Sequence, residues 1–239
     1  MKFIVDNALF TALPNAVFGV ITAYGLDNST ALASSVDLVE ETSRLHRELS
    51  GQKVKEHSAV IPYREAFLKL GINPNKYLPS IEALMTRVQK SGSLPQINPL
   101  VDLVNSVSLK YQVPMGAHDI DTIKEAMMIR PALAEDTFMP FGQEIEETAE
   151  IGELVYVADH NIRTRRWIWR QSEIGKVTAA TRNIFIPIDG FAGTNEDQVR
   201  AALALATTRL QHYFKGTIYT GMIDKNSPIF DDEQTLIPS

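Results

Sequence analysis

The hydrophobic pattern of this 239-residue chain changes its period about midway, and this change constrains the fold more than any other feature. In the first half, apolar residues recur every three or four positions, which predicts helices near residues 34–49, 62–70, 80–91 and 98–107. In the second half, short β-branched and aromatic runs predict strands at residues 154–158, 162–170, 183–188 and 217–223. A strand at residues 17–23 and a helix at residues 194–214 complete the pattern. The sequence therefore predicts an α+β fold.

Turn and cap residues mark where these elements should begin and end. Ser80 and Asn98 are placed to cap the third and fourth helices, and Asp159-His160-Asn161 is typical of a hairpin turn. Asp189-Gly190 is expected to end a strand, and the acidic tail after Asp224 is expected to be loose. The linkers are short and there is no internal repeat, so we expect no strong domain boundary.

Cysteine is absent, which excludes disulfides, thiolate nucleophiles, zinc ribbons and iron–sulfur clusters together. A chain of this length can bury a hydrophobic core that is stable without disulfides or bound metals. Asp6 interrupts the first apolar run where a signal peptide would continue, and no apolar run approaches the ~18 residues of a membrane span. We therefore expect a cytoplasmic protein with no membrane partner.

The charges are unevenly distributed along the chain. The net charge of −6 argues against a general duplex-DNA binder. Residues 135–153 contain seven acids and no base, whereas residues 163–182 contain six bases and one acid. This pattern indicates either separate surface fields that steer an anionic partner, or a solvated loop followed by a strand with charged edges.

The sequence motifs of the common enzyme classes are missing. There is no P-loop, no dinucleotide-binding glycine fingerprint, no nucleophile elbow and no HExxH helix. The five histidines are scattered without metal-ligand spacing, and His46, His57 and His212 are interpreted as surface residues. We expect neither a metal nor a cofactor.

A first polar region follows the fourth helix and the loop after it. Asp102 and Asn105 share one helix face. They either line a pocket that binds an amine or hydroxyl group, or accept hydrogen bonds from amides of neighbouring loops. His118 follows a Pro and a Gly, and its unperturbed pKa near neutrality suits a general base. A structural role for His118 and Asp119 is the alternative.

A second region combines both tryptophans of the chain with arginines. If residues 163–171 form one strand, alternation places Arg163, Arg165, Trp167, Trp169 and Gln171 on one face. Aromatic rings flanked by guanidinium groups suit stacking on a base and pairing with phosphate. The alternative is an aromatic core pair with arginines stacked over it.

Several segments in fixed order carry a resemblance to a known family. They are residues 98–105 (NPLVDLVN), Pro114-Met115 with Asp119, residues 166–172 (RWIWRQS), and Lys176-Val177-Thr178 followed by Thr181-Arg182-Asn183. Residues 63–67 and 79–84 add to it. The chain resembles the B3/B4 domain of the phenylalanyl-tRNA synthetase β chain, in its free-standing form. The resemblance implies a B3/B4-type fold with sandwich-like mixed sheets covered by helices. The expected domain covers residues 1–239, with an N-terminal α/β extension to about 95 and a core over about 96–223.

In the synthetase this domain hydrolyses tyrosine wrongly attached to the phenylalanine tRNA, so the resemblance implies a pocket for an aminoacyl-tRNA 3′ end. It does not imply aminoacylation. Two positions depart from the family pattern. Gly116 stands where the synthetase has a histidine after Pro-Met, and Ala179-Ala180 stand where it carries a glutamate between the two threonines. Both departures bear on the hydrolytic chemistry.

The leading hypothesis is an editing-like module that binds an aminoacyl-tRNA 3′ end and hydrolyses mischarged aminoacyl-tRNA in trans. The alternatives are a non-catalytic RNA- or tRNA-binding protein and a binder or enzyme of a free amino acid derivative. The candidate catalytic residue is His118. The candidate substrate-binding residues are Asn98, Asp102, Asn105, Asp119, Trp167, Trp169, Arg170, Gln171, Lys176, Thr178, Thr181 and Asn183.

Overall fold

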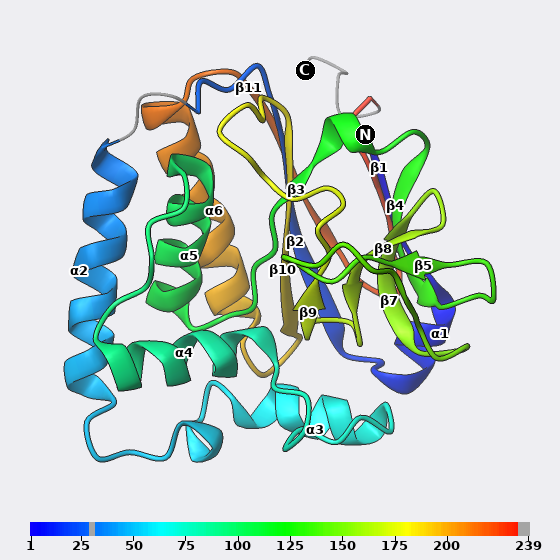
Figure 1. The fold of residues 1–239 in the computed structure, drawn as a ribbon, viewed down its shortest axis with the longest axis horizontal. Helices are drawn as coiled ribbons and strands as arrows, with labels where there is room; N and C mark the ends of the chain where they lie inside the picture. Colours follow the sequence, from blue (N-terminus) through cyan, green and yellow to red (C-terminus); the bar gives the residue numbers. More distant parts are fainter. Residues whose placement is uncertain (29–31, 234–239) are drawn as a thin grey trace.

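The fold is taken from a computed structural model that describes residues 1–28 and 32–233. Two β-sheets pack face to face, and a layer of helices covers the outer face of the smaller sheet (Figure 1). The sandwich-like α+β fold expected from the resemblance is therefore confirmed. Within the described parts of the chain, none of the helices is both long enough and apolar enough to cross a bilayer.

The smaller sheet is antiparallel throughout and has the order β11-β2-β10-β3. Its strands are β2 (Ala16–Tyr24), β3 (His118–Asp119), β10 (Ile184–Phe191) and β11 (Thr217–Ile223). All of β10, and all of β2 except its last residue, is buried. Both faces of these two strands are covered, which explains their continuous apolar runs.

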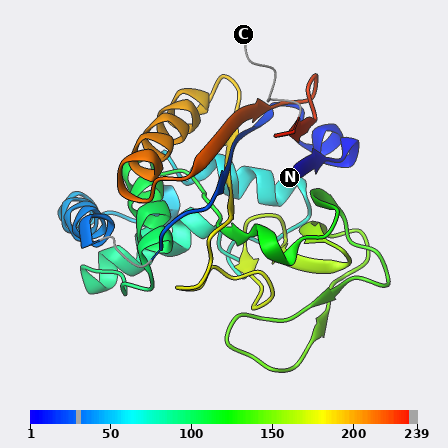
Figure 2. The ribbon, with the colours of Figure 1, turned by 90° about the horizontal axis from the view of Figure 1, so that it is seen from above.

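The larger sheet has the order β12-β1-β4-β7-β8-β5-β6, and β9 pairs with β8. Its strands are β1 (Lys2–Val5), β4 (Ala126–Pro131), β5 (Thr137–Phe138), β6 (Glu147–Thr148), β7 (Leu154–Ala158), β8 (Asn161–Arg165), β9 (Arg170–Gln171) and β12 (Ile229–Asp231). The pair β1–β4 is parallel, and so is β5–β8. The segment around β5 and β6 projects from this sheet (Figure 2).

The helices are α1 (Asn7–Ala12), α2 (Leu32–Glu48), α3 (Ile61–Lys69), α4 (Ser80–Ser91), α5 (Pro99–Tyr111) and α6 (Glu196–Tyr213), with short 3₁₀ turns at Val54–Glu56 and Ile120–Thr122. α5 and α6 pack on the smaller sheet, and α2 packs outside α5 (Figures 1 and 2). α3 and α4 lie across one end of the layers (Figure 1).

Two apolar clusters follow from the alternation of side chains along β10. Ile184, Ile186 and Ile188 face α5 and α6, whereas Phe185 and Phe191 face the larger sheet. Between the sheets, the ring of Phe3 packs on those of Phe18, Tyr156 and Phe185 at centroid distances of 4.9–6.2 Å. The space between the sheets is therefore the main core, and a polar residue pointing into it requires a specific reason.

The structure confirms most of the predicted elements and corrects four details. The hairpin β7–β8 turns at Asp159-His160, both at positive φ. Ser80 does not cap its helix, because α4 begins at Ser80 and Pro79 holds the cap position. The strand expected over residues 162–170 ends at Arg165, and Asp189-Gly190 lies within β10 rather than at its end.

The fourth correction concerns the acidic tail. Residues 229–231 form β12 and pair with β1, so this part of the segment after Asp224 is not loose. Residues 234–239 lie outside the described residues. The sequence pattern also missed β1 and β4, which are short strands whose partners are distant in the chain.

Candidate functional site

A pocket of about 120 Å³ is lined by residues of both sheets. It is called the inner pocket here. Its walls come from the segment before β3, from β7 and β10, and from the turn between β8 and β9, and Ser80 at the start of α4 contributes to the lining. These elements are far apart in the sequence, and only the residues around the β8–β9 turn are neighbours along the chain. The pocket is therefore a product of the tertiary fold.

The β8–β9 turn carries Trp167 into this pocket. Arg166 and Trp167 both have positive φ, 47° and 61°, which is uncommon for residues with side chains. The turn breaks the alternation expected along residues 163–171 and buries Trp167 completely against the rings of Phe67 and Phe191. The predicted common face is therefore wrong, because the chain reverses at Arg166. Strained backbone of this kind often occurs at functional sites.

Asp189 lies at a position of β10 that faces the larger sheet, as Phe185 and Phe191 do. Its Oδ1 accepts hydrogen bonds from Tyr156 Oη and Trp167 Nε1, each at 2.7 Å. Burial raises the pKa of Asp189 to about 7, although these two hydrogen bonds act in the opposite direction. An acid inside an apolar core, held by two donors, is the most unusual group of the pocket.

Two further contacts fix the backbone of Asp189. Tyr63 Oη donates to the carbonyl oxygen of Asp189 at 2.8 Å, and Asn195 Nδ2 donates to Tyr63 Oη at 2.8 Å. A Cβ at Gly190 would lie 2.3 Å from Val199 Cγ2, so only glycine lets α6 approach the strand here. The glycine after Asp189 thus serves packing within the strand, not a turn.

His118 lines the same pocket from β3. Its ring stacks with those of Tyr156 and Phe185, at centroid distances of 6.2 and 6.0 Å. Burial lowers the pKa of His118 to about 3, and the nearby Arg163 adds to this effect. The near-neutral pKa on which a general-base role depended is therefore contradicted. His118 Nδ1 is enclosed and has no hydrogen-bond partner among the described residues.

The position of His118 bears on the departure at Gly116. A Cβ at Gly116 would lie 3.2 Å from His118 Nε2, and both residues line the inner pocket. In extended backbone, residues two apart face the same side. The imidazole of His118 therefore lies beside position 116. Ala179 and Ala180 are exposed and line neither this pocket nor its neighbour.

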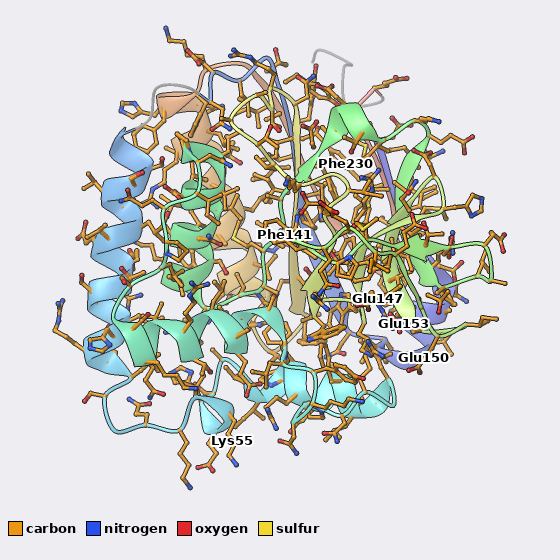
Figure 3. All side chains as sticks on the ribbon, in the orientation of Figure 1. Lys55, Phe141, Glu147, Glu150, Glu153 and Phe230 are labelled. Atoms are coloured by element: carbon orange, nitrogen blue, oxygen red, sulfur yellow. The ribbon has the colours of Figure 1, made fainter. Side chains whose placement is uncertain are left out.

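A second pocket, of about 260 Å³, adjoins the first across Met115 and Gln171, which line both. It is called the outer pocket here. The predicted residues Asn105, Gln171 and Lys176 line it. So do two largely exposed apolar side chains, Ile97 at 57% and Phe141 at 54%. Figure 3 labels Phe141 on the loop in front of the sheets.

Two candidate residues of α5 hold loops in place. Asn98 caps the helix by accepting from Val101 N at 3.1 Å, and it donates to Val177 O at 3.2 Å. Asp102 accepts from Ser35 Oγ and from Ile97 N, each at 2.9 Å. Both side chains are buried, and neither lines either pocket. The capping alternative therefore describes Asp102 better than the pocket interpretation.

The candidates between residues 119 and 183 join one turn to β3. Asp119 Oδ2 accepts from Thr181 Oγ1 at 2.6 Å, and Thr178 N donates to Thr181 Oγ1 at 2.9 Å. Asn183 Nδ2 donates to Asp121 Oδ1 at 2.7 Å. These four residues, Asp119, Thr178, Thr181 and Asn183, support the loop beside the outer pocket but do not line it.

The arginines of the second region are largely neutralised. Arg165 pairs with Glu153 at 2.8 Å and with Glu147 at 3.3 Å, and Arg166 pairs with Glu150 at 3.2 Å. Figure 3 shows these three glutamates gathered on one side of the larger sheet. The acidic and basic segments therefore meet, and the separate fields that their spacing suggested do not form there.

The remaining members of that region differ in exposure. Arg163 is buried and donates to Thr122 O at 2.6 Å. Trp169 is partly buried, lines the inner pocket, and packs on the ring of Tyr77 at 4.7 Å beside the guanidinium of Arg166. Arg170 is partly exposed, with its Nη1 3.8 Å from a Glu147 oxygen. Of the predicted nucleotide-side residues, Trp167, Trp169 and Gln171 come together, and Arg170 lines neither pocket.

Four polar residues that line the inner pocket were not among the site residues predicted from the sequence: Ser80, Tyr156, Thr164 and Asp189. An available signal for Asp189 was its period-two spacing from Phe185 and Phe191, which placed an acid on a core face. Within residues 1–28 and 32–233, no cluster of three or more His, Asp or Glu side chains is arranged to hold a metal ion.

Comparison with known proteins gives one family. The family model of the B3/4 domain matches residues 62–223, which contain every residue lining the inner pocket. A crystal structure of an N-terminal fragment of the phenylalanyl-tRNA synthetase beta-subunit from Pyrococcus horikoshii is similar at 16% identity with a TM-score of 0.49. The match covers 93% of this chain and 54% of that fragment, so the chain spans about half of its length. No curated protein matches the sequence. The chain belongs to the B3/4 domain family.

Proposed function

We propose that this protein binds the aminoacyl end of a charged tRNA and releases the amino acid by hydrolysing its ester bond. The aminoacyl group occupies the inner pocket, and the terminal adenosine occupies the outer pocket. The observation that carries the proposal is the pair of adjoining pockets, one mostly apolar and small and one larger, which share Met115 and Gln171. Membership of the B3/4 family and the sequence resemblance to the synthetase domain support it.

The inner pocket suits a small amino acid group. An apolar cavity of about 150 Å³ is enough to admit a benzene molecule, so 120 Å³ accommodates a short side chain. Rings and apolar groups form most of the wall, and a few polar groups converge on it. This combination is typical of small-molecule sites.

The outer pocket suits a nucleoside. The exposed ring of Phe141 offers a stacking surface, and Lys176 Nζ lies 5.7 Å from its centre. The side chain of Asn105 has no hydrogen-bond partner among the described residues, so its amide group can pair with a base edge. Stacking of a base on an aromatic side chain contributes about 1–3 kcal/mol and tolerates any sequence.

Hydrolysis requires a water held against the acyl carbon. The water oxygen bonds to that carbon, the bond from the carbon to the ribose oxygen breaks, and a proton from the water moves to the ribose oxygen. Ser80 and Thr164 line the inner pocket, and their hydroxyl groups have no hydrogen-bond partner among the described residues, so we assign them to hold this water. Positioning of this kind supplies much of the barrier reduction in such reactions.

The test is the release of amino acids from a panel of correctly and wrongly charged tRNAs. Wild type is compared with Thr164→Val and Ser80→Ala, and Lys55→Ala serves as the control because Lys55 is exposed and lies away from Phe141 (Figure 3). We expect release from a subset of the panel, at least tenfold slower in the two pocket variants, equivalent to about 1.4 kcal/mol. Binding without release would identify a non-catalytic tRNA-binding protein. The absence of both binding and release, for every member of the panel, would refute the proposal.

One observation favours a second candidate, recognition of a free amino acid derivative. Arg165 and Arg166 are paired with glutamates, and the chain has a net charge of −6, so the arginines beside the inner pocket offer little unpaired positive charge to an RNA backbone. Thermal stabilisation by amino acid esters, with none by tRNA or aminoacyl-tRNA, would select this candidate.

A further inference from the structure

The two carboxylate oxygens of Asp189 have different environments. Oδ1 receives both hydrogen bonds, from Tyr156 Oη and Trp167 Nε1. Oδ2 receives none from the described residues. The fully enclosed side-chain atoms that lack a partner are His118 Nδ1 and Arg163 Nε, so Oδ2 is not enclosed and faces the pocket that Asp189 lines. A nearly buried carboxylate thus presents one free oxygen to the inner pocket.

No protein cation neutralises this carboxylate. The residues lining the inner pocket include neither lysine nor arginine, and no ion pair of Asp189 is found within the described parts of the chain. The titratable groups around it are Tyr156 and Tyr63, whose pKa values are raised by burial, and His118, which is neutral. An ionised carboxylate buried without a counter-charge is costly, and either protonation or a cation that enters the pocket offsets this cost.

We propose that Asp189 binds a primary ammonium group of the ligand in the inner pocket. The ammonium donates to Oδ2, while Tyr156 and Trp167 keep Oδ1 in place. This inference rests on the proposed function, since it takes the inner pocket as the site of the aminoacyl group. It narrows the substrate class to amino acid groups with a free amine, and N-blocked groups are excluded.

The raised pKa of Asp189 supports the proposal. At about 7, the carboxyl group is close to half protonated at neutral pH, and pairing with an ammonium group would favour the ionised form. A hydrogen bond between an ammonium group and a carboxylate is stronger than one between neutral groups.

The ammonium group has two sources in an aminoacyl ligand. It is either the α-ammonium of an amino acid with a small side chain, or the side-chain ammonium of a basic amino acid. Alaninamide carries only the first, and Nα-acetyl-lysinamide carries only the second. N-acetyl-alaninamide and N-acetyl-norleucinamide are their uncharged counterparts.

The experiment is a titration of the full chain with these four compounds, followed by tryptophan fluorescence. Both tryptophans of the protein line the inner pocket, so the signal reports on this site. We expect one ammonium compound to bind at least tenfold more tightly than its uncharged counterpart. Equal affinities of charged and uncharged compounds would overturn the role of Asp189 while leaving ligand binding in the inner pocket intact. Binding by none of the four would overturn both proposals.

The variant Asp189→Asn tests the residue itself. The amide oxygen still accepts from Tyr156 and Trp167, so the pocket keeps its shape while the charge is lost. We expect the preference for the ammonium compound to fall at least tenfold, whereas Asp197→Asn, the same change at an exposed position of α6, leaves it unchanged. An unchanged preference in Asp189→Asn would refute the assignment. If this variant does not fold, the comparison of charged and uncharged compounds on the wild type decides the question.

Discussion

Asp189 and His118 line one pocket, and burial acts on them in opposite directions. The pKa of Asp189 is raised to about 7, and that of His118 is lowered to about 3. In both cases the neutral form is favoured, as expected for polar groups with few partners in an apolar site. Over the pH range between about 4 and 6.5, the two residues therefore contribute opposite slopes to the stability of the protein.

Asp189 is expected to destabilise the folded state at neutral and alkaline pH. Between its unfolded and folded pKa values the folded chain holds a proton that the unfolded chain has lost, so its contribution falls as pH rises from about 4 to about 7. We therefore compare the free energy of unfolding of Asp189→Asn with that of wild type at two pH values. The difference, variant minus wild type, should be about 2–4 kcal/mol larger at pH 8 than at pH 3.5. Urea unfolding at the two pH values measures this difference. A constant difference between variant and wild type would contradict the raised pKa.

His118 is expected to destabilise the folded state in acid. The unfolded chain binds a proton below about pH 6.5 and the folded chain does not until about pH 3, so stability is lost as pH falls across this range. Replacement by phenylalanine removes this effect. It breaks no hydrogen bond, because the His118 ring makes none with the described residues. The difference in free energy of unfolding, His118→Phe minus wild type, should therefore be about 3 kcal/mol larger at pH 4 than at pH 7. Equal pH profiles of unfolding in the two proteins would refute the neutral histidine.

At the level of elements, Asn98, the residue directly before α5, holds the loops beside the outer pocket in place. Asn98 caps this helix and donates to Val177 O, and Val177 lines the outer pocket. Asp102 and Thr181 similarly bind loop backbone or loop side chains. The motif residues that carry the family resemblance thus divide into those that build the walls and those that face the pockets.

The variant Asn98→Ala tests this division. It removes the cap and the contact with Val177, so we expect a loss of about 1–2 kcal/mol in stability. Asn98→Ser keeps a side-chain acceptor for Val101 N and should recover part of the loss. Ligand affinity of the inner pocket should stay within about threefold, equivalent to 0.7 kcal/mol. A larger loss of affinity than of stability would return Asn98 to the binding residues.

The sequence predicted elements whose signals are local. Asn98-Pro99 marked the start of α5, and Asp159-His160 marked the β7–β8 hairpin. It did not predict the reversal at Arg166 and Trp167, because no local rule places these residue types at positive φ. β1 was missed because its partners, β4 and β12, lie more than a hundred residues away, so pairing rather than propensity defines it.

The site was predicted less completely than the fold for the same reason. Trp167, Trp169 and Gln171 were found through their motif, and they line the inner pocket. Asp189, Tyr156 and Thr164 come from three strands whose alignment only the tertiary structure gives. The basic character assigned to the second region failed because the partners of Arg165 and Arg166 lie in the preceding acidic loop.

At the scale of the whole molecule, charge limits how an RNA can be held. Lys176 lines the outer pocket and pairs with Glu173, and Arg170, which precedes the pocket-lining Gln171, lies 3.8 Å from Glu147. With one or two phosphate contacts, the logarithm of affinity should fall with that of salt at a slope no steeper than about −1.5. Fluorescence titration of aminoacyl-tRNA at several salt concentrations measures the slope. A value near −4 or steeper would place the main RNA-binding surface elsewhere on the protein.

The joint use of the two pockets is the central claim, and a ligand that spans both tests it most directly. The measurement is calorimetric titration with an aminoacyl-adenosine in which an amide replaces the labile ester, beside adenosine and the amino acid amide alone. Because linkage makes the second contact intramolecular, the joined compound should bind at least tenfold more tightly than either part, and Phe141→Ala and Asp189→Asn should each weaken it. A joined compound that binds no more tightly than its better part would contradict the account.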